Sequence, residues 1–256
     1  MKAVILAGGE GARLRPLSYV IPKPLLPVGT KPILEIIIER LRDHGFTDII
    51  LNTGYKAELI EAYFRDGNGL NVNIIYCQED KPWGTAAPVK LIEHLLDNQP
   101  FLTMNGDLLT DLNFGAMYQM HLDKSAELTV ATTGYSYKVP YGVIDMQDNM
   151  ITSINEKPEL KFLINAGVYV VSPSALDIIP KETFFNMTDL IQALIDQNRK
   201  VETYYIDGEW QDLGTMEVYE KVNAEYFRMD IGSFKLPRFN FTQEYLDAAN
   251  AFSRKA

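Results

Sequence analysis

The chain has 256 residues, in which 34 acidic residues outnumber 24 basic ones, so its formal net charge is −10 and its pI is about 4.8. This acidic balance argues against a nucleic-acid-binding protein, and no long apolar run is present to form a membrane-spanning helix. A single cysteine, Cys77, excludes an intramolecular disulfide and, without a Cys/His cluster, a structural zinc site. With no signal-peptide pattern at the N-terminus, we expect the protein in the cytoplasm.

The first half of the chain alternates apolar runs with segments of helical spacing. Residues 3–7, 48–52, 71–77 and 101–104 are predicted strands, and residues 31–44, 57–65 and 84–96 are predicted helices. This alternation predicts an α/β fold with a Rossmann-like, doubly wound, mostly parallel sheet. Ligand sites in such sheets lie beyond the carboxyl ends of the strands.

The second half has more strands and tighter turns. Strands are predicted at 127–133, 142–146, 150–154 and 167–171, with an edge strand at 201–206 and a hairpin turn at 147–149; helices are predicted at 114–122, 188–197 and 216–227, with a short helical turn at 174–178. We expect one domain over residues 1–228, divided into halves at 1–111 and 112–228. Residues 229–256 form an aromatic-containing tail that we expect to be helical after Thr242.

A glycine-rich, basic segment follows the first strand. Gly8, Gly9 and Gly11 come directly after it, and the basic side chains of the segment are Arg13, Arg15 and Lys23. Glycine backbone lets N–H groups approach an anion closely, and arginine and lysine supply fixed positive charge for phosphates. Residues 1–31 carry a net charge of +4 in this acidic chain. The segment therefore predicts a polyphosphate site. It matches neither a Walker A loop nor the dinucleotide G-x-G-x-x-G fingerprint. The absence of that fingerprint disfavours a nicotinamide-dependent dehydrogenase.

The segment resembles the signature of the sugar-1-phosphate nucleotidyltransferases, also called NDP-sugar pyrophosphorylases. That family has a GGxGTRLxPLT loop after its first strand and a later PKPLLPV, where this chain has GGEGARLRPLS and PKPLLPV. Ala12 and Ser18 depart from the family's threonines. The loss of a hydroxyl at Ala12 puts one side-chain hydrogen bond in doubt, but no backbone N–H. Six segments match in family order over residues 1–228, and the resemblance implies a nucleotide-diphospho-sugar transferase fold with sugar-binding β insertions.

The resemblance implies a Mg²⁺ site on two distant carboxylates. Asp107 lies in NGD and Asp212 in WQDLGT, which match the family's metal-binding segments. Mg²⁺ prefers oxygen ligands and commonly takes one or two carboxylates together with phosphates and water. From the residues alone, each aspartate could equally be a helix N-cap.

The resemblance also assigns the sugar phosphate to three segments: Tyr141 and Gly142 in PYG, Glu156 and Lys157 in EKP, and Asn165 in NAG. A carboxylate for sugar hydroxyls and an ammonium for phosphate are chemically suited to that ligand. Without the resemblance, Glu156 and Lys157 would be interpreted as a solvated charged turn before a proline.

The nucleotide is assigned to the first strand, its loop and a later GTA segment. The implied nucleotide-binding residues are Leu6, Ala7, Gly8, Gly9, Gly11, Arg13, Gln78, Gly84 and Thr85. GTAAP is most similar to the GTAGP of mannose- and heptose-1-phosphate guanylyltransferases. Gln78, with a donor and an acceptor, also suits uracil or thymine, whereas the N–H edge of guanine would prefer a carboxylate such as Glu79.

The implied reaction joins an NTP to a sugar 1-phosphate and releases pyrophosphate, with Arg13, Lys23 and Asp107 as catalytic residues. GTP with a mannose- or heptose-type sugar is favoured, and a uridylyl- or thymidylyltransferase for glucose-type sugars is the alternative. A second alternative is a non-catalytic regulatory paralogue, but that would lack Arg13, Lys23, Asp107 or Asp212, and all four are present. The partners are the two substrates, without nucleic acid or membrane; a homo-oligomer is compatible with the sequence.

Overall fold

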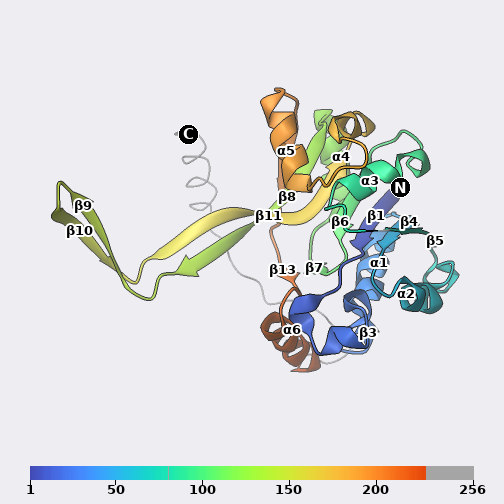
Figure 1. The fold of residues 1–256 in the computed structure, drawn as a ribbon, viewed down its shortest axis with the longest axis horizontal. Coiled ribbons are helices and arrows are strands. Elements are labelled where there is room, and N and C mark those ends of the chain that lie inside the picture. The colour runs from blue at the N-terminus through green and yellow to red at the C-terminus, as the bar shows by residue number, and fades with distance from the viewer. Residues whose placement is uncertain (80, 229–256) are drawn as a thin grey trace.

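A seven-stranded sheet organises the protein, for which a computed structural model describes residues 1–79 and 81–228 (Figure 1). The order across the sheet is β12-β8-β11-β6-β1-β4-β5. Its strands are β1 (Lys2–Ala7), β4 (Asp48–Thr53), β5 (Asn73–Gln78), β6 (Phe101–Asn105), β8 (Leu128–Lys138), β11 (Glu159–Val171) and β12 (Val201–Tyr205). Every neighbouring pair is parallel except those that involve β11. The predicted mostly parallel sheet is therefore confirmed.

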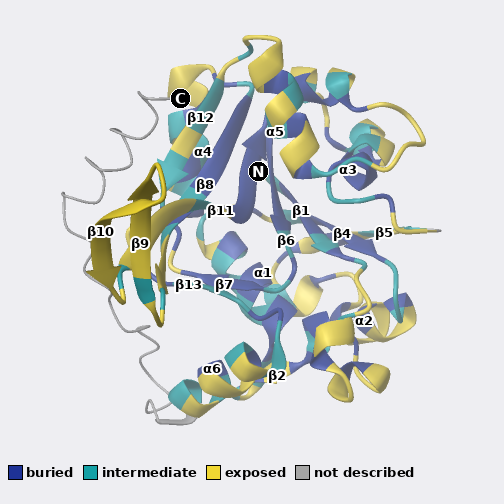
Figure 2. Cartoon of the chain, turned by 60° about the vertical axis from the view of Figure 1, so that its left-hand side comes forward, coloured by how far each residue is buried: buried dark blue, intermediate teal, exposed yellow. Residues whose placement is uncertain are grey.

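Helices cover both faces of this sheet. They are α1 (Ile33–Asp43), α2 (Ala57–Phe64), α3 (Ala87–Leu91), α4 (Phe114–Lys124), α5 (Met187–Asp196) and α6 (Met216–Arg228). Successive residues of β1 point to opposite faces, so Ile5 packs in one core cluster with α1, α4 and α6, while Val4 packs in the other with α3 and α5. Full burial of each such side chain stabilises the fold by roughly 1.5–3 kcal/mol. Figure 2 shows the buried strands between these helical layers.

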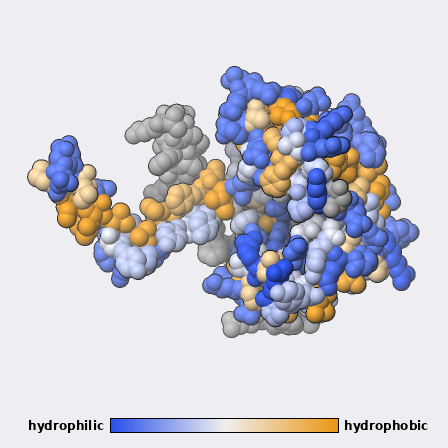
Figure 3. Space-filling view, viewed as in Figure 1, coloured by the Kyte–Doolittle hydropathy of each residue, from blue (hydrophilic) through white to orange (hydrophobic). Residues whose placement is uncertain are grey.

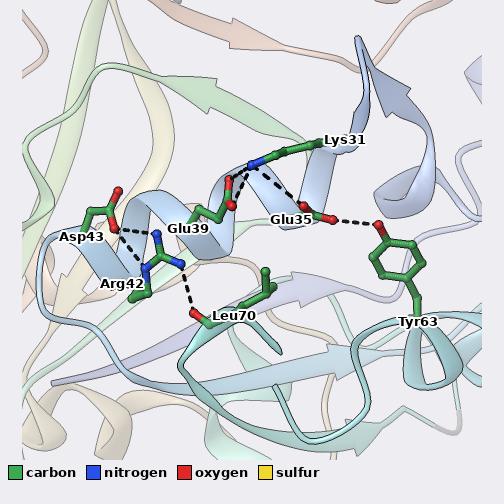
Figure 4. Close-up of polar contacts among 7 residues, drawn as sticks. All are labelled: Lys31, Glu35, Glu39, Arg42, Asp43, Tyr63 and Leu70. Carbon is green, nitrogen blue, oxygen red and sulfur yellow. Dashed lines mark hydrogen bonds and ion pairs between the residues drawn. The ribbon is translucent and has the colours of Figure 1, made fainter. Parts of the chain in front are cut away.

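Ion pairs and hydrogen bonds tie α1 to its neighbours (Figure 4). Lys31 Nζ lies 2.6 Å from the Glu39 carboxylate, and Tyr63 Oη of α2 donates a 2.7 Å hydrogen bond to Glu35. That hydrogen bond is the main reason why the pKa of Tyr63 rises to about 12. Arg42 donates to the carbonyl oxygen of Leu70 at 3.0 Å. These contacts join α1 to Lys31 before it, to α2 and to the turn at Leu70.

The second half contributes a projecting β structure and short accessory strands. β9 (Gly142–Gln147) and β10 (Met150–Glu156) form an antiparallel hairpin that projects from the body together with the ends of β8 and β11 (Figure 1). The predicted hairpin turn is confirmed, with Asp148 and Asn149 both at positive φ, as a two-residue turn of this twist requires. β7 (Leu108–Thr110) pairs with β13 (Trp210–Asp212), and β2 (Pro27–Val28) pairs with β3 (Lys31–Pro32).

Three sequence predictions differ from the structure. The predicted helix over 84–96 is wrong as one element, because α3 ends at Leu91 and a separate helical turn spans Glu93–Leu95. β11 begins at Glu159 rather than residue 167, since pairing with β8 extends it through a stretch with no buried face. β7 and β13 were not predicted, because three-residue strands leave little pattern. The expected helix after Thr242 lies outside the described residues.

No helix in the described part of the chain has the length and apolar character needed to cross a membrane.

Candidate active site

The loop after β1 is shaped by a left-handed glycine and a buried serine. Gly11 has φ +61°, a conformation that a side chain would strain. Its carbonyl oxygen accepts hydrogen bonds from Leu14 N at 2.8 Å and from Ser18 Oγ at 2.9 Å. Ser18, which replaces the family's threonine, therefore still holds the loop.

Three neighbouring parallel strands deliver their loops to the same place. A Cβ on Gly54, after β4, would lie 2.8 Å from the Gly8 carbonyl oxygen, so the two loops fit together only because Gly54 has no side chain. Gly106, after β6, donates a 2.9 Å hydrogen bond to the Leu6 carbonyl oxygen. A cavity of about 670 Å³ opens between these loops, which is a size that accommodates a nucleotide.

Most of the predicted nucleotide-binding residues line this cavity: Leu6, Ala7, Gly8, Gly9, Gly11, Arg13, Gly84 and Thr85. Lys23 and Asp107 line it as well. Gln78 is exposed and is not among the lining residues, whereas its neighbour Glu79 is. Arg15 is not among the lining residues; it pairs at 3.1 Å with Glu10, which is one, and lies 5.0 Å from the centre of the Tyr19 ring.

The four predicted charged residues converge at one wall of the cavity. Lys23 is buried, donates a hydrogen bond to Asp107 Oδ2 and lies 4.0 Å from Asp212 Oδ1. A Cβ on Gly214 would lie 2.9 Å from Arg13 Nη2 and 3.0 Å from Asp212 Oδ1, so Arg13 and Asp212 flank that glycine. Burial first, and then the Asp107 charge, raise the pKa of Asp212, while Lys23 and Arg13 lower it in part.

The two carboxylates suit a divalent cation. Asp107 Oδ1 and Asp212 Oδ1 are both buried and accept no hydrogen bond. Within residues 1–79 and 81–228 no cluster of three or more His, Cys, Asp or Glu side chains occurs, so a cage of protein ligands alone is not available. Two carboxylates with unpaired oxygens, one of which belongs to the lining residue Asp107, are a donor set that suits Mg²⁺.

Neither aspartate is a helix cap. Asp107 lies between β6 and β7, and no helix follows it directly. At the start of α6, the side chain of Thr215 rather than Asp212 accepts a hydrogen bond, from Val218 N at 3.4 Å. Helix capping is therefore excluded as the role of either carboxylate.

Glu79 and a contact between two loops contribute further to the cavity lining, and a Cβ on Gly8 would lie 3.2 Å from Glu79 Oε1. Asn52 donates a hydrogen bond to Glu79 Oε1, which orients that carboxylate. Gly84 has φ +91°, and a Cβ there would lie 2.6 Å from the Phe185 carbonyl oxygen. Thr85 Oγ1 accepts a 2.9 Å hydrogen bond from Met187 N, so Thr85 caps α5 rather than the helix that follows it in sequence.

Four of the five predicted sugar-phosphate residues gather with one another, outside the lining of this cavity. Glu156 is paired with Gly142 at the base of the β9–β10 hairpin, and Lys157 N donates a 3.2 Å hydrogen bond to the Tyr141 carbonyl oxygen. None of these four residues lines the cavity. Asn165 bonds Gly167 N at 2.9 Å and Tyr169 Oη at 2.8 Å, so its side chain shapes an irregularity in β11.

The lining side chains that sequence reasoning missed include Tyr55, Lys81 and Phe184. Tyr55 and Lys81 could have been found, because they follow β4 and β5 closely at the same edge of the sheet as the glycine loop. Phe184 reaches the cavity from the loop before α5, and no local pattern predicts that.

Comparison with known proteins places this geometry in a family. The family model described as nucleotidyl transferase matches residues 2–228. The chain belongs to this nucleotidyl transferase family. A relative from Synechocystis named UTP–glucose-1-phosphate uridylyltransferase is 34% identical over 256 residues, covering 93% of this chain and 66% of the relative. A mannose-1-phosphate guanyltransferase from Schizosaccharomyces pombe is 34% identical over 228 residues, covering 86% of this chain and 62% of that relative.

A solved structure supports the fold. HddC from Yersinia pseudotuberculosis, complexed with GMP-PN, has a TM-score of 0.68 and 27% sequence identity, and the match covers 88% of this chain and 99% of that chain. This chain spans less than two thirds of the length of the two curated relatives, at 66% and 62%. The architecture is thus that of the nucleotidyl transferases, with the charged wall at the carboxyl end of β1.

Proposed function

We propose that this protein transfers a nucleotidyl group from an NTP to a sugar 1-phosphate and releases pyrophosphate. An oxygen of the sugar phosphate attacks the α-phosphorus, and the bond between the α-phosphorus and the bridging oxygen breaks with its electron pair leaving on pyrophosphate. The observation that carries the proposal is the convergence of Arg13, Lys23, Asp107 and Asp212 on one wall of a nucleotide-sized cavity. The same convergence argues against a regulatory paralogue that has lost its chemistry.

The residues would act by position and charge. The nucleophile is already anionic, so no general base is needed, and the barrier lies in charge repulsion and alignment. Backbone N–H groups of the loop at Gly8, Gly9 and Gly11 would hold the phosphates. Arg13 would neutralise the β- and γ-phosphates as pyrophosphate leaves, and Lys23 would bridge the α-phosphate and the sugar phosphate.

Asp107 and Asp212 would hold Mg²⁺, as their unpaired buried oxygens suggest. When bound, the ion would supply charge that offsets the repulsion between the two anionic substrates.

Guanine is the base that the cavity favours. Glu79 lines the cavity, and a carboxylate can accept hydrogen bonds from N1–H and N2–H of guanine together, whereas uracil offers only its single N3–H. Gln78, the residue suited to uracil or thymine, is exposed outside it. The yeast relative named a mannose-1-phosphate guanyltransferase is in line with GTP and a mannose- or heptose-type sugar. The Synechocystis relative keeps a uridylyltransferase as the alternative.

We also propose that residues 1–111 bind the nucleotide and residues 112–228 the sugar phosphate, through Tyr141, Gly142, Glu156, Lys157 and Asn165, within a single domain. The cytoplasm stays our predicted location.

The proposal is tested with a panel of four NTPs against glucose-, mannose- and heptose-type sugar 1-phosphates, with Mg²⁺ present and pyrophosphate release as readout. We expect release with GTP and a mannose- or heptose-type sugar. Release only with UTP or dTTP would replace the base assignment, and binding of a nucleotide sugar without any release would support the regulatory alternative.

The same assay tests the charged wall with Asp107→Ala. We expect turnover to fall by orders of magnitude while thermal unfolding stays cooperative, because Asp107 lines the cavity and is not a helix cap. Asp123→Asn, an exposed carboxylate on α4, is the matched control and should retain full activity. Unchanged turnover in Asp107→Ala would count against the assignment.

A further inference from the structure

One exposed aromatic side chain stands apart from the others. Hydrophobic side chains are exposed at many places on this protein, most visibly along the projecting hairpin of β9 and β10 (Figure 3). A single exposed apolar residue needs no explanation of its own. Among the large hydrophobic side chains that are exposed in residues 1–79 and 81–228, however, Phe184 is the one that lines the nucleotide-sized cavity, and it is 59% exposed.

A segment distant in sequence holds Phe184 at this position through its neighbour, Phe185. The backbone N–H of Phe185 donates a 2.9 Å hydrogen bond to the Trp83 carbonyl oxygen. Its carbonyl oxygen accepts hydrogen bonds from Ala86 N at 2.9 Å and from Ala87 N at 3.1 Å. The side chain of Phe185 packs against the core cluster that contains Trp83. The exposure of Phe184 therefore does not come from a loosely held loop.

The start of α5 strengthens the same contact. Asn186 and Asp189 form a capping box there, in which Asn186 N donates a 2.8 Å hydrogen bond to the Asp189 carboxylate. Met187 N donates to Thr85 Oγ1 at 2.9 Å. Phe184 is thus followed by a helix start whose position is fixed against residues 83–87.

A glycine makes room for this contact. A Cβ on Gly84 would lie 2.6 Å from the Phe185 carbonyl oxygen, so a side chain at that position would push the two segments apart. Gly84 and Thr85 both line the cavity, as does Glu79 earlier in the same segment. Phe184 is therefore brought into the cavity lining beside the segment that carries the Glu79 carboxylate.

A nucleobase needs two kinds of contact. Its edge needs hydrogen-bond partners, and its flat face needs an apolar or aromatic surface. The charged wall suits phosphates, and the Glu79 carboxylate offers acceptors for an edge. Within the described residues, the aromatic side chains that line the cavity are Tyr55 and Phe184.

Tyr55 is the less suitable of these two rings. Its backbone N–H donates a 3.1 Å hydrogen bond to the Gly8 carbonyl oxygen, which places it at the glycine loop. Lys56 Nζ lies 5.5 Å from the centre of its ring. In residues 1–79 and 81–228, by contrast, no aromatic or cation–π contact involves the ring of Phe184. Its face is available to a planar ligand.

We propose that Phe184 stacks on the face of the nucleobase whose edge Glu79 binds, and that this contact favours a purine. The proposal rests on the proposed function in taking an NTP as the ligand of the cavity. Every base has a face that can stack, but a purine presents two fused rings and a pyrimidine only one, so a purine gains more. Phe184 is a binding residue and takes no part in the transfer of the nucleotidyl group.

The stack is tested first by calorimetric binding of nucleotides to the full chain, with Mg²⁺ and without a sugar 1-phosphate. We expect Phe184→Ala to weaken GTP binding by about 10-fold or more, and UTP binding by less. Ribose 5-triphosphate, which lacks the base, should bind the variant and the wild type equally. Ile195→Ala, a similarly exposed apolar residue on α5 outside the cavity lining, is the matched control and should bind GTP as the wild type does.

Three results of this experiment would contradict the proposal. Unchanged GTP affinity in Phe184→Ala overturns it, and so does an equal loss of affinity for ribose 5-triphosphate, which would place the ring on the ribose or the phosphates. An equal loss for GTP and UTP overturns the preference for a purine.

A second variant keeps an aromatic ring at the same position. Phe184→Trp should bind GTP with an affinity close to that of the wild type, because an indole also offers a flat face. Its added fluorescence, measured against the background of Trp83 and Trp210 in the wild type, should be quenched when GTP binds. An affinity as low as that of Phe184→Ala, or no added quenching at saturating GTP, places the base away from residue 184 and overturns the proposal.

Kinetics separate this proposal from the proposed function. In the pyrophosphate assay, Phe184→Ala should raise the KM for GTP by about 10-fold, while kcat and the KM for the sugar 1-phosphate stay unchanged. A rise in the KM for the sugar 1-phosphate instead would overturn the stack and leave the proposed function standing. A protein that binds GTP through Phe184 but releases no pyrophosphate would remove the proposed function and leave the stack.

Discussion

The backbone N–H of Leu213 donates a 3.1 Å hydrogen bond to the carbonyl oxygen of Asp107. This bond continues the antiparallel pairing of β7 with β13, in which Asp212 lies opposite Leu108. Two carboxylates from distant parts of the chain are thereby fixed beside Lys23, and burial first, then the Asp107 charge, raise the pKa of Asp212. Much of the site's chemistry follows from this short pair of strands.

Asp212→Asn should lower activity and raise stability at once. A carboxylate whose folded pKa is raised is destabilising when ionised, and this cost disappears as pH falls through the folded pKa. The neutral amide removes the cost at pH 7, so we expect a higher melting temperature together with turnover lowered by orders of magnitude. Thermal unfolding and pyrophosphate release measure the two effects. A lower melting temperature at pH 7 would show that Lys23 and Arg13 more than offset the burial of Asp212.

Lys23→Met should destabilise the protein in a way that a divalent cation reverses. Removing one partner of a buried charged group costs roughly 3–5 kcal/mol, because Asp107 and Asp212 are left uncompensated. Added Mg²⁺ should raise the melting temperature of this variant more than that of the wild type. Lys31→Met, which breaks the pair with Glu39 outside the cavity, is the matched control and should show no extra response to Mg²⁺. An equal response in the two variants would argue against the cation site.

Glu79→Gln should relax the choice of base. Losing the acceptor for guanine N–H groups should lower kcat/KM for GTP by about 10- to 100-fold and change that for UTP little, since an unpaired buried polar edge costs about 1–3 kcal/mol. Gln78→Ala, one residue earlier but exposed, should leave both values unchanged. If Gln78→Ala is the variant that loses GTP, the base lies on the other side of β5.

His121 should make stability depend on pH. It is buried, with Nδ1 2.9 Å from Thr129 Oγ1 and Nε2 3.0 Å from Ser172 Oγ, and burial lowers its pKa to about 4. The unfolded chain therefore binds this proton more readily, so the free energy of unfolding should fall by up to about 3 kcal/mol as pH drops from about 6.5 to about 4.

Urea unfolding across that pH range measures the effect. In His121→Gln this part of the pH dependence should vanish, because glutamine does not titrate. The exposed His94→Gln should keep the wild-type slope. Identical slopes in all three proteins would mean that other groups govern acid unfolding.

The sequence by itself determined the features that depend on neighbours in the chain. The strand and glycine loop up to Gly11, the alternation of strands and helices, and the turn at Asp148 and Asn149 are all set by local periodicity and backbone preference. Those rules act over a few residues, and they were sufficient for the fold class and for the glycine loop of the cavity.

Only the tertiary structure decided which distant side chains meet. Asp107 and Asp212 look like caps until β7 pairs with β13, and Glu79 rather than Gln78 lines the cavity because adjacent strand residues face opposite sides. Likewise, the turn that carries Lys157 is predictable, but its position at the base of a projecting hairpin follows from the length of the β8–β11 pairing. Such placements depend on packing between remote segments, which no local pattern encodes.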